Sequence, residues 1–96
     1  MAGRAATDPC QTYLVESYHS GLRAEELQTM VSRIREAISE MSADGKAIRH
    51  VSSMIVPTDE SFLCLIDAAS EQYVRVAYER AGFSYQRISP ALTEDS

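Results

Sequence analysis

The sequence has little basic charge. Nine Lys and Arg residues stand against fourteen Asp and Glu residues among 96, so the formal net charge is −5. Proteins that bind nucleic acid usually carry a basic stripe, and anionic membranes attract basic segments, so we expect neither partner. No apolar run approaches the roughly 20 residues of a membrane-spanning helix, and no segment has the pattern of a signal peptide.

Cysteine is also scarce. The two cysteines, Cys10 and Cys64, are far apart in the sequence. They provide neither the paired spacing of a zinc ribbon nor a disulfide framework, and we expect a cytoplasmic protein with reduced thiols. The sequence also lacks a nucleophile elbow and a phosphate-binding loop, so hydrolase and kinase functions have no support.

The composition that remains is typical of one small globular domain, with 45% hydrophobic and 24% charged residues. A chain of this length buries only about 60–65% of the surface that its unfolded form exposes, so we expect further burial through oligomerisation. Residues 1–11 are polar and without periodicity, and residues 94–96 form a short acidic tail. The sequence therefore predicts a single domain at 12–93 between two flexible tails.

Periodicity divides this domain into four strands and two helices. Segments rich in β-branched, aromatic or alternating apolar residues, typical of strands, are 12–18, 47–56, 61–67 and 85–92. Apolar residues at three- and four-residue steps predict one helix that has Glu25 and Glu26 in its first turn and ends at Asp44, and another between Ser70 and Gly82. The order βαββαβ predicts an α+β, ferredoxin-like fold with sheet order 4-1-3-2 and both helices on one face. Since the third strand is apolar on both faces, we expect a second copy to cover the open face in a homodimer.

Polar side chains of the predicted strands are the candidates for chemistry. We place the first and third strands as parallel neighbours, which brings these side chains to one end of the sheet. They are Glu16, Tyr18, His19, His50, Asp67 and Arg87. Strand alternation puts Glu16 and Tyr18 on the open face. The same rule places His50 and Met54 together on one face of the second strand, and Val51 under the helices.

Two functions fit these residues. A binding protein would hold a metal or a small molecule, with His50, Glu16 and His19 as metal ligands, because imidazole and carboxylate suit divalent transition metals. A cofactor-independent isomerase, cyclase or oxygenase would instead use His50, Glu16 or Tyr18 to move protons on an apolar substrate. The predicted ligand-binding set is Glu16, Tyr18, His50, Asp67 and Arg87. Structural roles are the alternative: an ion pair of Glu16 with Arg87, and a buried apolar role for Cys64.

Four segments also carry a resemblance to a known family. They are Y-L-V-E-S-Y at 13–18, G-L-R-A-E-E-L at 21–27, V-P-T-D-E-S-F-L-C-L-I-D-A at 56–68 and E-R-A-G-F-S-Y-Q-R-I at 79–88. They resemble a small ferredoxin-like nickel-binding family, mostly classed as domains of unknown function. The resemblance implies a homodimer whose two sheets face each other as an α+β barrel, with nickel or another divalent transition metal as the cofactor.

The same resemblance bears on individual residues. Cys64 and Asp67 occupy positions that match the family's cysteine and acid. Where the metal-binding branch has histidines, this chain has Ser52 and Ala77 or a neighbour of it, and His50 stands at an aromatic position. The sequence thus predicts a small homodimeric binding protein that holds a transition metal or a small molecule at the polar end of its sheet.

Overall fold

The computed structural model describes residues 10–94. The strands are β1 (Gln11–Tyr18), β2 (Ile48–Val56), β3 (Ser61–Ala68) and β4 (Arg87–Ala91). The helices are α2 (Leu27–Ala43) and α3 (Glu71–Ala81), and the short 3₁₀ turns are η1 (Ala24–Glu26) and η2 (Pro57–Asp59). The predicted order βαββαβ is confirmed. The predictions for residues 1–9 and 95–96 lie outside the described residues.

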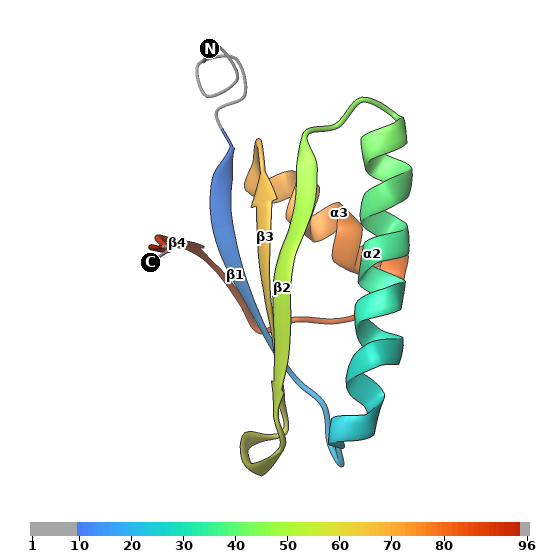
Figure 1. Ribbon diagram of the computed structural model, residues 1–96, viewed down its shortest axis with the longest axis vertical. Helices are drawn as coiled ribbons and strands as arrows, with labels where there is room; N and C mark the ends of the chain where they lie inside the picture. Colours follow the sequence, from blue (N-terminus) through green and yellow to red (C-terminus); the bar gives the residue numbers. More distant parts are fainter. Residues whose placement is uncertain (1–9, 95–96) are drawn as a thin grey trace.

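The molecule has two layers, a four-stranded sheet and two helices that cover one of its faces (Figure 1). The strand order β2-β3-β1-β4 is the predicted one. The core lies between the layers and is filled from α2, α3 and the inward faces of β1 and β3. Its fully buried large side chains include Tyr78, Phe62, Ile34, Met41, Ile66, Val15 and Val74. Within residues 10–94, no helix is long and apolar enough to cross a membrane.

The direction of the central strands differs from our prediction. β1 pairs antiparallel with β3 as well as with β4, so the prediction of parallel central neighbours was wrong. In this topology each crossover helix joins two parallel strands that have an antiparallel strand between them. Glu16, near the end of β1, therefore lies opposite Leu63 and Arg87, whereas Asp67, at the end of β3, lies opposite Thr12. The polar residues are divided between two ends of the sheet.

A bulge in β2 changes which side chains face the helices. The register with β3 shifts between His50 and Ser52, so Val51 pairs with no residue of β3. A bulge reverses the alternation that follows it and turns side chains in new directions. Ile48 and His50 therefore face the helix layer while Met54 faces the open side, and Val51 is exposed. The prediction that His50 and Met54 share a face was wrong, as was the placement of Val51 under the helices.

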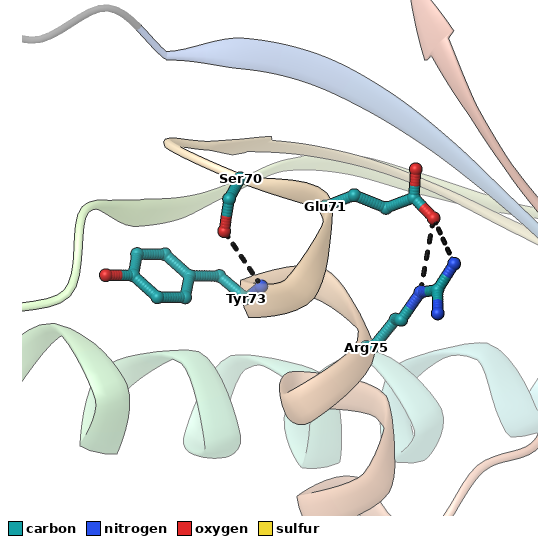
Figure 2. A network of polar contacts seen from close by, with 4 residues as sticks. All are labelled: Ser70, Glu71, Tyr73 and Arg75. Atoms are coloured by element: carbon teal, nitrogen blue, oxygen red, sulfur yellow. Dashed lines mark hydrogen bonds and ion pairs between the residues drawn. The ribbon is translucent and has the colours of Figure 1, made fainter.

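Local sequence fixes the start of α3, as Figure 2 shows. The hydroxyl of Ser70 accepts a hydrogen bond from the Tyr73 backbone N–H at 3.4 Å, which confirms the predicted N-cap. Glu71 accepts hydrogen bonds from the Arg75 guanidinium one turn later. Gly82 ends the helix with a φ of 80°, a left-handed conformation that suits glycine. These local contacts fix where α3 begins and ends.

Candidate functional site

The open face of the sheet has an apolar centre. Leu14 and Leu65 lie directly opposite each other on β1 and β3, and Met54 lies opposite Leu63 on β2 and β3. The three leucines are half-buried, and Met54 is 54% exposed. Together with Ser52 these side chains border a hollow of about 90 Å³. The open face thus exposes an apolar surface to solvent, and this surface contains the small hollow.

An ion pair lies at each of two diagonal corners of this apolar centre. Arg87 Nε donates to Glu16 Oε2 at 2.9 Å, which confirms the predicted pair. At the other corner Arg49 donates to Asp67, whose carboxylate also accepts the hydroxyl of Thr12. In both pairs the carboxylate stands on a central strand with 19% of its side chain exposed, and the arginine stands on an edge strand. The two acids are thereby neutralised within the face.

Tyr18 follows Glu16 on the same face and is 51% exposed. Its backbone N–H donates to the side chain of Gln86 at 3.0 Å, which ties the end of β1 to the segment before β4. Of the predicted ligand-binding set, Glu16, Tyr18 and Arg87 therefore do lie at one corner. Asp67 lies at the diagonal corner, and the remaining member of the set is on the other side of the sheet.

That remaining residue is His50, at the edge of the helix layer. Its Nδ1 lies 3.5 Å from Nε of Arg35 on α2, and its Nε2 lies 2.8 Å from the hydroxyl of Ser53. Because a guanidinium only donates, Nδ1 is the acceptor and Nε2 carries the proton that is donated to Ser53. The Ser53 oxygen in turn lies 2.9 Å from Sγ of Cys64. A polar row thus leads from the surface into the core.

The inner end of this row is unreactive. Cys64 is fully buried, and burial raises its thiol pKa, although the contacts with Ser53 and Tyr78 act in the opposite direction. Burial, and then the nearby thiol, also raises the pKa of the Tyr78 phenol. The Tyr78 hydroxyl comes close to Cys64 but has no hydrogen bond of good geometry within residues 10–94. The thiolate needed for a nucleophile or a soft-metal ligand is therefore disfavoured here, and the predicted apolar role of Cys64 fits.

His19 lies in an aromatic cluster at the far end of the sheet. Its ring meets Phe62 and Phe83 edge-on, with centroids 6.4 and 5.9 Å apart. Its Nε2 lies 2.9 Å from the hydroxyl of Ser17. The predicted metal set of His50, Glu16 and His19 is therefore spread over three places. Across the described chain, no three or more His, Cys, Asp or Glu residues come together closely enough to hold a metal ion.

Comparison with known proteins identifies a family and a solved structure that share this architecture. A family model described as "Nickel responsive protein SCO4226-like" matches residues 13–90. The chain belongs to this family. The crystal structure of SCO4226 from Streptomyces coelicolor A3(2) superposes with a TM-score of 0.69 at 14% identity, over 88% of this chain and 99% of that one. At this identity the likeness shows the fold alone. No curated protein matches the chain.

Because the SCO4226-like family is described as nickel responsive, the described residues can be compared with the needs of a nickel site. Imidazole is a ligand that suits nickel and other divalent transition metals. Both histidines of this chain lie on the helix side, and each has protein hydrogen-bond partners. The acids of the open face, Glu16 and Asp67, are held by arginines. The described residues of a single chain therefore do not fit a nickel centre.

The setting of His50 leads to a prediction about pH. Burial of the ring, and then the charge of Arg35, lowers the His50 pKa below its ordinary value of 6.5. In the unfolded chain the ring takes up a proton near that value, so below about pH 6.5 the unfolded state binds more protons than the folded state. The contribution of His50 to the free energy of unfolding is therefore fully present above about pH 6.5 and decreases as the pH falls below it.

We therefore expect the free energy of unfolding of the wild type to fall between about pH 7.5 and about pH 5.5, and His50→Gln to lose less over the same interval. Urea denaturation of both proteins at the two pH values measures this difference. Equal losses in the two proteins would show that the ring is protonated as readily in the fold as in the unfolded chain.

Proposed function

We propose that this protein is a small homodimeric binding protein that holds an apolar small molecule between the open sheet faces of two copies. The observation that carries the proposal is the apolar centre of the open face, formed by Leu14, Met54, Leu63 and Leu65. Such a centre on one whole side of a sheet is costly to leave in water. A chain of 96 residues has no further layer with which to cover it within residues 10–94.

A second copy is the occupant that the charges favour. The two ion pairs occupy diagonal corners, with Glu16 and Arg87 at one and Asp67 and Arg49 at the other. Since each pair is neutral by itself, two such faces meet without repulsion between like charges. A two-fold interface must be self-complementary, and a neutral apolar centre with paired charges around it satisfies that requirement.

The size of the hollow suggests the ligand. Each copy contributes about 90 Å³. Two facing hollows would make a space near that of an apolar protein cavity of roughly 150 Å³, which is known to hold benzene. We infer a ligand with an apolar body of about that size. The open face also carries Glu16, Tyr18, Asp67 and Arg87, which lie outside the lining of the hollow. We infer that they contact polar groups of a ligand that extends beyond it.

Nickel is the second candidate, because the family is described as nickel responsive. In a sheet-to-sheet dimer, His19 and His50 would both stay outside the shared space, on the helix side. Only carboxylates that already have arginine partners would face the metal. The alternative of a cofactor-independent enzyme keeps only part of its predicted set of His50, Glu16 and Tyr18. His50 lies on the helix side and Glu16 is paired with Arg87, which leaves Tyr18 as the predicted proton carrier that is exposed on the open face. For these reasons we favour the apolar ligand.

Native mass spectrometry of the purified protein tests the assembly and the class of ligand together. We expect the mass of a dimer with no stoichiometric nickel before or after nickel is added. Indole then serves as an apolar probe in a methyl NMR titration. We expect the methyl signals of Leu14, Leu63, Leu65 and Met54 to shift with saturation.

Leu92 provides the control within the same spectrum, because it is 97% exposed and lies beyond β4. Its methyl signals are expected to stay in place. A monomer at micromolar concentration would contradict the proposed dimer. Stoichiometric nickel, or indole shifts at Leu92 as large as those at Leu65, would overturn the proposed ligand.

A further inference from the structure

A groove between α2 and the edge strand β2 lies on the helix side of the sheet, away from the proposed dimer face. Its volume is about 460 Å³. Hydroxyl and cationic side chains border it, and no carboxylate does. The bordering polar residues are Arg35, Ser39, Ser42, Arg49 and His50. In a chain with a net charge of −5, a groove with this composition calls for an explanation.

The donors on α2 form a row. Arg35, Ser39 and Ser42 are spaced by four and then three residues, so they lie along one side of the helix. Arg35 has no carboxylate partner within residues 10–94, unlike the five arginines that form ion pairs there. Of the two arginines that border the groove, Arg35 is therefore the one whose charge no carboxylate of the described residues compensates.

His50 positions this arginine. Its Nδ1 lies 3.5 Å from Nε of Arg35, and this is the one hydrogen bond that the guanidinium makes within the described part of the chain. The two terminal nitrogens have no hydrogen-bond partner among residues 10–94. A guanidinium with both terminal nitrogens available can donate two parallel hydrogen bonds to a phosphate or carboxylate, which is bidentate binding.

The other cations of this region have explanations of their own. Arg49 is bound to Asp67 on the open face. Lys46 borders an adjoining pocket and follows the C-terminal end of α2, where the helix dipole favours a cation. Neither explanation applies to Arg35, which stands in the middle of the helix beside two serines. The argument for a ligand therefore depends on Arg35, Ser39 and Ser42.

We propose that this groove binds the phosphate group of a small phosphate monoester. Arg35 would donate hydrogen bonds to two phosphate oxygens, and the Ser39 and Ser42 hydroxyls would donate to the others. The groove is larger than an inorganic phosphate ion, and the exposed side chain of Ala43 borders it beside the edges of Ile38 and Ile48. An organic body attached to the phosphate would cover these apolar atoms, which is why an ester suits the site better than the free ion.

Calorimetric titration of the wild-type protein with phenyl phosphate tests the proposal, and inorganic phosphate is a second probe. We expect saturable binding of phenyl phosphate below about 10 mM, which is the weak end of specific affinities. Weaker binding of inorganic phosphate than of phenyl phosphate would support an ester as the ligand. Equal binding of the two probes would contradict the ester and indicate a site for the free anion. Arg35→Gln is expected to weaken binding at least about tenfold.

Arg75→Gln is the matched control, since it makes the same change in net charge on the exposed side of α3, where Arg75 pairs with Glu71. It is expected to bind phenyl phosphate as the wild type does. No saturable binding of either probe would overturn the proposal, and so would equal losses in the two variants. Tighter binding of a hexaglutamate peptide than of phenyl phosphate would also overturn it, in favour of an acidic protein partner at this edge strand.

Discussion

Replacing Leu65 with aspartate is expected to convert the proposed dimer into a monomer. Leu65 lies at the centre of the open face, opposite Leu14 on β1 and Ser52 on β2. In the proposed interface its side chain loses contact with water, and a carboxylate there would be buried without a partner. Such burial costs several kcal/mol, so the dissociation constant is expected to rise by more than about a hundredfold. Sedimentation velocity at several protein concentrations measures the change.

Leu92→Asp is the control, because it adds the same charge at a residue that is 97% exposed. It is expected to remain dimeric. Circular dichroism of Leu65→Asp separates dissociation from unfolding, since the monomer keeps its helices over the other face of the sheet. A folded Leu65→Asp protein that sediments as a dimer would place the interface elsewhere than on the open face.

Much of the fold was predictable because its signals are local. The cap at Ser70, the glycine that ends α3 and the apolar stripes of both helices each depend on residues within a few positions of one another. The topology then followed from the order of elements and from the rule that crossovers are right-handed. Alternation along β1 was also read correctly, since Val15 is buried and Glu16 faces the open side.

The candidate site was less predictable than the fold. One reason is that the side-chain pattern of a strand does not determine the direction of its neighbours. The same alternation fits a parallel and an antiparallel neighbour, and we assigned the wrong one to β1 and β3. The order of elements does contain the answer. The short connection between β2 and β3 makes them an antiparallel hairpin, and the helical crossover makes β1 parallel to β2, so β3 must be antiparallel to β1. The pair of Arg49 with Asp67 was missed as well, because these two residues lie opposite each other only in the register that the bulge in β2 creates.

The second limit is the bulge in β2. No glycine or proline marks it, and the residue that it leaves unpaired, Val51, is an ordinary strand former. One extra residue moves His50 from the predicted open face to the groove beside α2, where it meets Arg35. Arg35 and Ser53 were absent from the predicted site for the same reason. Contacts of this kind depend on register, and register is a property of the whole sheet.

The largest loss of stability is expected from Phe62→Ala. Phe62 is fully buried between the sheet and the helices, and its ring packs edge-on against those of His19 and Phe83. Removing it leaves a cavity in a cluster that closes one end of the core. Truncations of this kind cost about 3–5 kcal/mol. Urea denaturation at a fixed protein concentration measures the loss, the fixed concentration being needed because a dimer's stability depends on it.

Phe83→Ala is the matched comparison, because it removes the same ring from a partly exposed place in the same cluster, where Arg33 lies 4.4 Å above it. It is expected to cost less than Phe62→Ala, since water can fill part of the space that it leaves. Both residues are on the helix side, so neither change should alter the dissociation constant of the folded dimer. A loss below about 1 kcal/mol for Phe62→Ala, or a larger loss for Phe83→Ala, would mean that the aromatic cluster does not close the core.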